Sequence, residues 1–162
     1  MNETNQIIKK IKSISESKQL SISTAESCTG GLISKLLTDE PGSSSFFDSA
    51  IISYSNGSKV KLLHVQSDIL SKYGAVSEKV VIEMAKGMLK SSSSSVVMTI
   101  SGIMGPHSDN TDKPVGLIWI CVMSKDGSSS CKSINLNGSR AENRNNAALI
   151  ALNYLYDFLN QL

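Results

Sequence analysis

Residues 25–31 have the sequence Ala-Glu-Ser-Cys-Thr-Gly-Gly, which combines carboxylate, hydroxyl and thiol groups with two glycines. A β-type segment precedes this stretch and a helical one follows, so it is predicted to connect a strand to a helix. Amides at a helix N-terminus are unpaired and partly positive, so those of Thr29, Gly30 and Gly31 are suited to holding an anion such as phosphate. The stretch does not match the P-loop pattern, and capping of the helix by Ser27 or Thr29 explains it equally well.

A second stretch, residues 54–59, has the sequence Tyr-Ser-Asn-Gly-Ser-Lys and follows another β-type segment. Because Tyr54 and Lys59 are five residues apart near a strand end, both can face one cleft. A lysine removed from water loses its proton more readily and can then act as a general base. A single lysine on a short helix is more often an exposed surface residue, and the residues alone leave both interpretations open.

A third candidate region begins where an apolar strand ends in Ser101 and Gly102. Backbone amides at such a strand end are able to stabilise an oxyanion, although a rigid turn is the commoner explanation. Arg140 and Arg144 lie one helical turn apart, a spacing that allows both to contact one phosphate. The same spacing is also typical of ordinary surface charges.

The overall composition is that of a globular protein. Of the 162 residues, 40% are hydrophobic and 19% are charged, which lies outside the range of disordered chains. The net charge of +2 is too small to indicate nucleic acid or an anionic membrane as a partner. The aromatic content of 5% does not favour a base-stacking surface. We therefore expect no nucleic-acid partner.

The segment MNETNQIIKK lacks the apolar core of a signal peptide, and no window reaches the apolar length of a membrane span. The cysteines Cys28, Cys121 and Cys131 form no CxxC pair and cannot all be joined by disulfides within one chain. This pattern favours a reducing compartment, so we expect a cytoplasmic protein without a membrane partner. The two histidines are too few for a conventional zinc site, and neither a metal nor a cofactor is expected.

Hydrophobic periodicity predicts the elements that must position these residues. Helices are expected over 3–18, after Gly31, from a cap at Asn56 to Leu63, after a cap at Ser77, and from Ser139 onward. Strands are expected over 20–24, 46–54, 96–100 and 115–123, and after a turn at 125–127 up to Leu136. Residues 102–113 are expected to form a long irregular loop, which is often functional.

Helices alternate with strands in the first part of the chain, and a hairpin comes late. This order is typical of a mixed sheet with helices on both of its faces. We therefore expect one α/β domain over residues 1–162.

In their order along the chain, these motifs are similar to those of one known family. They are Thr24–Gly31, Pro41–Ser44, Tyr54–Asn56 with Lys59, Tyr73–Ser77, Ser101–Ile103 with Gly105 and Pro106, and Lys113–Gly116. Together they closely resemble the CinA carboxy-terminal domain family. The resemblance runs from about residue 5 to the C-terminus, and the first and fourth motifs are its most specific parts.

The resemblance implies a three-layer α/β/α sandwich and a nicotinamide-nucleotide amidase. Such an enzyme converts nicotinamide mononucleotide and water to nicotinate mononucleotide and ammonia in the pyridine nucleotide cycle. Some members of the family carry a larger fused domain, and this chain resembles the stand-alone form. A small nucleotide is therefore the expected substrate, no cofactor is expected, and a homodimer is the commonest arrangement for a small enzyme.

The resemblance also implies roles for individual residues. Ser27 is the expected nucleophile and Lys59 its base, with Tyr54 shuttling the proton or orienting the lysine. A neutral lysine can activate a serine hydroxyl without histidine. The expected substrate-binding residues are Glu26, Thr29, Gly30, Gly31, Ser43, Ser44, Asn56, Ser101, Gly102 and Arg140. Among them, Glu26 would position the site or the substrate, and the amides of residues 29–31 with Ser43 and Ser44 would hold the oxyanion and the phosphate.

The sequence departs from the family pattern mainly in loops. Ser101 stands where threonine is usual, Met104 where alanine is usual, residues 107–110 replace a glycine-rich stretch, and Ser139 replaces an acid. A non-catalytic module that binds or senses pyridine nucleotides in the same pocket is therefore the main alternative to an amidase. An interaction protein linked to DNA uptake or damage response is another.

Two other catalytic arrangements also stay open at the level of sequence. Cys28 competes with Ser27 as nucleophile, because helix-end amides lower the pKa of a thiol, although a small buried thiol is the commoner state. His107 with Asp109 suggests a serine–histidine site. Their loop is irregular, however, and no pattern in the sequence places them near Ser27.

Overall fold

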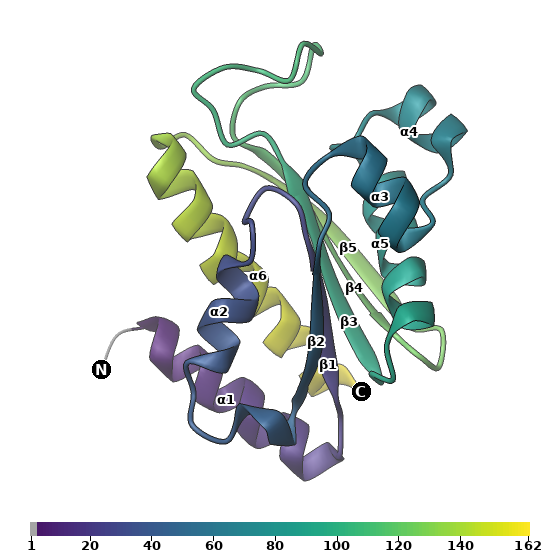
Figure 1. Cartoon of the computed structure of the whole chain (residues 1–162). Helices are drawn as coiled ribbons and strands as arrows, with labels where there is room; N and C mark the ends of the chain where they lie inside the picture. Colours follow the sequence, from purple (N-terminus) through teal and green to yellow (C-terminus); the bar gives the residue numbers. More distant parts are fainter. Residues whose placement is uncertain (1–2) are drawn as a thin grey trace.

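A five-stranded mixed sheet separates two layers of helices in the computed structural model, which describes residues 3–162 (Figure 1). The strands are β1 (Ile22–Glu26), β2 (Phe47–Ile52), β3 (Val96–Gly102), β4 (Leu117–Ser124) and β5 (Ser129–Asn135). Their order across the sheet is β2-β1-β3-β4-β5. β1 runs parallel to both of its neighbours, and β4 runs antiparallel to β3 and β5.

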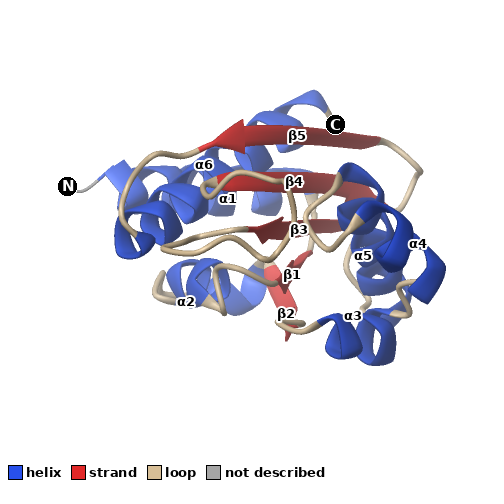
Figure 2. Cartoon of the chain, turned by 90° about the horizontal axis from the view of Figure 1, so that it is seen from above, coloured by secondary structure: helices blue, strands red, loops and turns tan. Residues whose placement is uncertain are grey.

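The helices divide into two groups, one on each face of the sheet (Figure 2). On one face lie α1 (Glu3–Lys18), α2 (Leu32–Thr38) and α6 (Arg140–Gln161), and on the other lie α3 (Asn56–Leu63), α4 (Ser67–Tyr73) and α5 (Glu78–Ser91). A short 3-10 helix, η1 (Ser43–Ser45), precedes β2. This arrangement confirms the expected three-layer α/β/α sandwich. Over residues 3–162, no helix combines the length and apolar character needed to cross a membrane.

The connections between the parallel strands create a crevice at one end of the sheet. The chain leaves β1 through α2 to reach β2, and then passes through α3, α4 and α5 to reach β3 on the other side of β1. From β3 it continues to β4, away from β1. Because the segments that follow β1 and β3 diverge, the carboxyl ends of these two strands form the topological switch point at which α/β proteins bind ligands.

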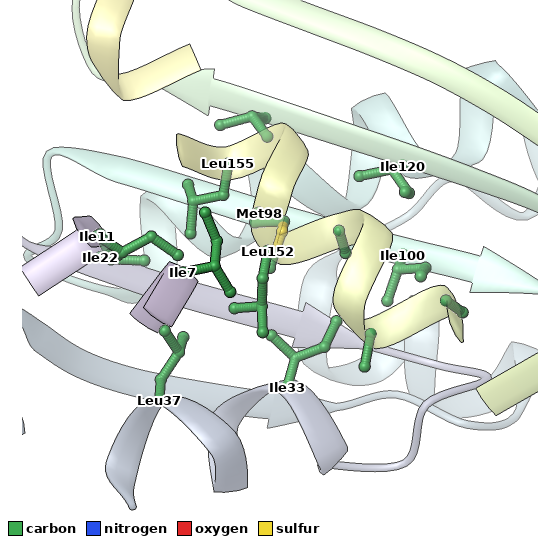
Figure 3. Packing of buried hydrophobic residues seen from close by; sticks show 14 of the residues in the cluster. Ile7, Ile11, Ile22, Ile33, Leu37, Met98, Ile100, Ile120, Leu152 and Leu155 are labelled. Carbon is green, nitrogen blue, oxygen red and sulfur yellow. The ribbon is translucent and has the colours of Figure 1, made fainter. Parts of the chain in front are cut away.

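The larger apolar cluster fills the space between the sheet and the layer of α1, α2 and α6 (Figure 3). β3 shows how the sequence produces both interior layers. Val96, Met98 and Ile100 belong to this cluster, whereas Val97 belongs to a second cluster beneath α5. Since side chains alternate between the faces of a strand, a strand covered on both faces needs the continuous apolar run seen here.

Some observed element boundaries differ from the sequence prediction. β1 continues to Glu26 rather than ending at Thr24, because its pairing with both neighbouring strands extends that far. α4 has no counterpart in the predicted elements, since its seven residues are too few to display a clear helical period.

The N-terminal cap of α3 also differs from the prediction. Ser55, and not Asn56, caps this helix. Oγ of Ser55 accepts a hydrogen bond from the amide of Ser58, and the Ser58 hydroxyl accepts one from the amide of Ser55. This reciprocal capping box fixes the first turn of α3, which carries Lys59.

Candidate active site

A cleft of about 650 Å³ opens where the carboxyl ends of β1 and β3 diverge. This volume lies within the roughly 300–1,000 Å³ that is typical of small-molecule sites. The sequence-predicted residues that line the cleft are Ser27, Tyr54, Asn56, Lys59, Ser101, Gly102 and Arg140. Segments that are far apart in the chain therefore meet here, as the switch-point topology requires.

Ser27 and Lys59 form a hydrogen-bonded pair in this cleft. Ser27 directly follows β1, and its amide donates to the carbonyl of Ile100 at 3.1 Å, which fixes it at the end of the sheet. Nζ of Lys59 donates to Oγ of Ser27 at 2.9 Å. It also donates to the carbonyl of Ser53 at 2.8 Å and, less closely, to that of Tyr54 at 3.4 Å. The hydroxyl and the amine are thus within the distance that a nucleophile and its general base require.

Lys59 is 0% exposed, although lysine is among the residues least often buried. Burial lowers its pKa from 10.5 to about 8, and the opposing electrostatic effect of Cys28 is smaller. An amine with this pKa is neutral in roughly one-tenth of molecules at pH 7. The fraction of molecules with a free lone pair on this lysine near neutral pH is therefore much larger than for an exposed surface lysine.

Cys28, the competing nucleophile, is buried beside Ser27. Its side chain is 5% exposed, and burial raises the pKa of its thiol to about 12 despite hydrogen bonds from nearby backbone amides. A protonated thiol is a much weaker nucleophile than a thiolate. The environment therefore favours Ser27 over Cys28 as the nucleophile.

Glu26 is fully buried, and its carboxylate binds the start of α2 rather than the cleft. Oε2 accepts hydrogen bonds from the Thr29 hydroxyl at 2.6 Å and from the amides of Gly31 at 3.0 Å and Ile33 at 3.1 Å. Oε1 accepts one from the amide of Ser34 at 2.8 Å. The protein's own carboxylate thus occupies the helix N-terminus that seemed suited to an external anion. Of the two roles expected for Glu26, the structure therefore supports positioning of the site, since the carboxylate does not line the cleft.

The predicted anion-binding residues Thr29, Gly30 and Gly31 likewise do not line the cleft. The amide of Gly30 donates to the carbonyl of Ser27 at 3.1 Å, and the amide of Gly31 donates to Glu26. Both glycines have positive φ angles, +61° and +94°, which side-chain-bearing residues rarely adopt. The glycine pair is therefore explained by the tight turn after Ser27, and not by the approach of a ligand.

Ser43 and Ser44 lie at the opposite end of the sheet from the cleft. They form η1, immediately before the N-terminal end of β2, whereas the cleft lies at the carboxyl ends of the parallel strands. The six residues of β2 span roughly 20 Å. The two serines do not line the cleft, so the structure does not bring them together with Ser27 and Lys59.

Arg140 and Tyr54 meet at the cleft wall. Nη2 of Arg140 donates to the phenol oxygen of Tyr54 at 3.0 Å, and Nη1 donates to the carbonyl of Gly105 at 2.8 Å. The Tyr54 side chain is 59% exposed. The contact between Tyr54 and Lys59 involves the main-chain carbonyl and not the phenol. Tyr54 therefore helps to orient the lysine through its backbone, while its hydroxyl lies beside Arg140.

Two residues that the sequence analysis did not select hold the loop between β3 and β4. Nζ of Lys113 donates to the carbonyls of Tyr73 and Val76, each at 2.6 Å, and so joins this loop to the segment between α4 and α5. Asn143 is buried in the first turns of α6 and donates to the carbonyl of Met104 at 3.1 Å. Lys113 belongs to one of the motifs, but neither the type nor the spacing of Asn143 indicates this contact.

His107 and Asp109 line the same cleft. The hydrogen bond to Oγ of Ser27 nevertheless comes from Lys59, which gives the serine a different partner from the histidine considered above. Among the described residues 3–162, no group of three or more His, Cys, Asp or Glu side chains is arranged to hold a metal ion.

Comparison with known proteins places this geometry in a family. The model of the CinA C-terminal domain matches residues 4–159. A nicotinamide-nucleotide amidohydrolase PncC from Escherichia coli (strain K12) is 36% identical over 155 residues, which cover 96% of this chain and 94% of that protein. The crystal structure of a competence/damage inducible protein, CihA, from Agrobacterium tumefaciens matches with a TM-score of 0.93 and 32% identity, over 99% of this chain and 97% of that one.

Other curated relatives are much longer than this chain. A CinA-like protein from Kosmotoga olearia is 45% identical over 136 residues, which cover 84% of this chain but only 33% of that protein. The chain thus spans about a third of the length of such relatives. The family model and the relatives of similar length agree with each other and with the fold: the chain belongs to the CinA C-terminal domain family.

Proposed function

We propose that this protein is a nicotinamide-nucleotide amidohydrolase that hydrolyses the carboxamide of nicotinamide mononucleotide. The observation that carries the proposal is the buried Lys59 amine 2.9 Å from the Ser27 hydroxyl in a cleft of suitable volume. The similarity over most of its length to a protein named for this activity supports the choice of substrate. Some longer relatives are named only as CinA-like or competence-damage inducible proteins, so the activity itself needs direct measurement.

In the proposed reaction, Oγ of Ser27 attacks the carboxamide carbon while Lys59 accepts the hydroxyl proton. The tetrahedral intermediate then expels ammonia, which takes its extra proton from Lys59, and an ester to Ser27 remains. Water attacks this ester with Lys59 again as the base, and nicotinate mononucleotide leaves as Ser27 regains its proton. Asn56, Ser101 and Gly102 line the same cleft and are the remaining predicted groups for contacting the carboxamide.

In the proposed mechanism, main-chain carbonyls orient the amine of Lys59. A neutral amine has two N–H groups and one lone pair. The carbonyls of Ser53 and Tyr54 accept hydrogen bonds from Nζ of Lys59, which leaves the lone pair directed at the Ser27 hydroxyl. The orientation of the base is therefore set by the strand-to-helix connection between β2 and α3 and requires no histidine or carboxylate.

The rate is expected to depend on pH through Lys59. The base acts only when it is neutral, so activity should fall as the pH drops below the lysine pKa of about 8. We expect kcat/KM for nicotinamide mononucleotide to rise about tenfold per pH unit at acidic pH and to level off above about pH 8. A profile measured between pH 6.5 and 9.5 checks this, and a flat profile over that range would exclude Lys59 as the base.

Arg140 is the residue that we propose to bind the substrate phosphate. It lines the cleft, carries a permanent charge, and lies on α6 away from the Ser27–Lys59 pair. Arg140→Gln is expected to raise KM for nicotinamide mononucleotide by about 10- to 100-fold with a much smaller change in kcat, because a phosphate contact of this kind is worth about 1.5–3 kcal/mol. Arg140→Lys keeps the charge but not the planar guanidinium group. Its KM should therefore lie between those of the wild type and Arg140→Gln. A fall in kcat at unchanged KM would contradict the phosphate role.

The function is tested by ammonia release from nicotinamide mononucleotide with the purified wild-type chain. Two related compounds serve as controls. Nicotinamide riboside lacks the phosphate, and free nicotinamide lacks the whole ribose phosphate. Release of ammonia together with nicotinate mononucleotide supports the amidase. Tight binding of the nucleotide without release of ammonia would instead favour the non-catalytic module. If the chain neither binds the nucleotide nor releases ammonia, the assignment of the substrate is overturned.

A further inference from the structure

Cys121 and Cys131 lie side by side on the face of the sheet that α5 covers, and neither lines the cleft of the proposed reaction. Their sulfur atoms are 2.6 Å apart, and both thiols are free. We propose that these two cysteines form a redox-sensitive pair, which oxidants of the hydroperoxide class convert to a cross-strand disulfide. The proposal is independent of the amidase activity.

The register of the sheet makes this bond possible without movement of the backbone. Cys121 of β4 is paired directly with Cys131 of β5 in the antiparallel ladder. Residues opposite each other in such a ladder have Cα atoms roughly 4.5–5.5 Å apart, which lies within the range of roughly 4.4–6.8 Å found in disulfides. Both side chains also point to the same face of the sheet, since each contacts the cluster beneath α5.

The two thiols differ in a way that gives each a distinct role. Cys121 is fully buried, whereas Cys131, on the edge strand β5, is half-buried and within reach of a small oxidant. The two sulfur atoms share a hydrogen bond that lowers the pKa of Cys131, while the same bond and burial raise the pKa of Cys121. Cys131 is therefore the attacking thiolate, and Cys121 is the resolving thiol.

The chemistry balances with a hydroperoxide as the oxidant. The Cys131 thiolate attacks the terminal oxygen and breaks the O–O bond, which gives a sulfenic acid and releases the alcohol, or water if the oxidant is hydrogen peroxide. The Cys121 sulfur then attacks the sulfenic sulfur, and water leaves as the S–S bond forms. The two thiols together lose two electrons and two protons, and the hydroperoxide gains both.

The third cysteine provides an internal control. Cys28 is buried on the other side of the sheet, among the residues packed against α1, α2 and α6, and its raised pKa disfavours the thiolate. It has no cysteine partner opposite it in the ladder, because it follows the end of β1. In the folded protein we therefore expect two thiols to react as a pair and the third to persist.

The experiment exposes the reduced chain of residues 1–162 to a small excess of hydrogen peroxide under native conditions. Free thiols should fall from three to one, the intact mass should fall by about 2 Da, and a peptide map should show residues 121 and 131 joined. Because the new bond closes a short loop, the melting temperature should rise by roughly 5 °C, and a dithiol reductant should reverse all four changes. In Cys28→Ser the free thiols should fall from two to none, with the same mass decrease and the same rise in melting temperature.

Cys131→Ser is the matched control, since the serine lies at a half-buried edge position that tolerates a hydroxyl. This variant should show neither the mass decrease nor the rise in melting temperature. Three persistent thiols in the folded wild type would overturn the proposal. Dimer formation through an intermolecular disulfide, or an internal cross-link that still forms in Cys131→Ser, would overturn it as well.

Discussion

Lys59→Met is expected to reduce ammonia release from nicotinamide mononucleotide by at least about a thousandfold, with the fold retained. Methionine fills a similar volume without a charge, so the buried position accepts it, but no group then takes the Ser27 proton. Ser27→Ala should cause a loss of similar size, because the two residues act as one unit. The measurement is steady-state ammonia release, with circular dichroism to verify folding.

Two control variants distinguish a loss of this chemistry from a disturbance of the packing. Lys61→Met changes an exposed lysine on the same helix and should leave activity within about twofold of wild type. Ser53→Ala removes a buried hydroxyl that has no hydrogen-bond partner but keeps the main-chain carbonyl that holds Lys59, so activity should also persist. Retention of more than about a tenth of the activity in either Lys59→Met or Ser27→Ala would disprove the serine–lysine mechanism.

The second large effect is expected at Glu26, as a positioning residue. Its carboxylate holds four donors at the turn that places Ser27, the next residue in the chain. Glu26→Gln puts an amide NH2 group where one carboxylate oxygen accepts a hydrogen bond and removes the charge at the start of α2. We expect a loss of about 2–4 kcal/mol in the free energy of unfolding, measured by chemical denaturation.

The effect of Glu26→Gln on catalysis distinguishes positioning from substrate binding. Because the carboxylate does not line the cleft, kcat should fall while KM for the nucleotide changes little. Glu142→Gln is the control, since Glu142 caps α6 from an exposed position and its substitution should change stability much less than Glu26→Gln does. A rise in KM at constant kcat in Glu26→Gln would show instead that Glu26 acts on the substrate.

The sequence alone predicts the layers of this fold well, because long amphipathic helices and buried strands have strong periodic patterns. It predicts the pairing of Ser27 with Lys59 only through the family resemblance. The residue types by themselves favour an exposed lysine on a short helix. No local sequence pattern indicates that α3 directs this side chain towards Ser27 at the end of β1. Burial of Lys59 is a property of tertiary packing that single-sequence patterns do not contain.

The predicted site residues that do not line the cleft have a common physical explanation. A motif shows that residues occur together in a family, but not to which end of a strand they belong. Ser43 and Ser44 precede β2 and so lie at the amino end of the sheet, while Ser27 follows β1 at the carboxyl end. Glu26 is adjacent to Ser27 and yet accepts a hydrogen bond from the amide of Gly31, because a buried helix N-terminus must be satisfied from within the protein.

The buried amine that makes the proposed chemistry possible also limits the stability of the fold. Between about pH 8 and 10.5 the folded chain holds Lys59 neutral while the unfolded chain keeps it charged, so the free energy of unfolding rises with pH across this window. At neutral pH the folded state carries an energetic cost on the order of 3 kcal/mol for the buried cation. The inactive Lys59→Met protein should therefore resist denaturant better than the active one. In this family member, selection for a reactive base would work directly against selection for thermal stability.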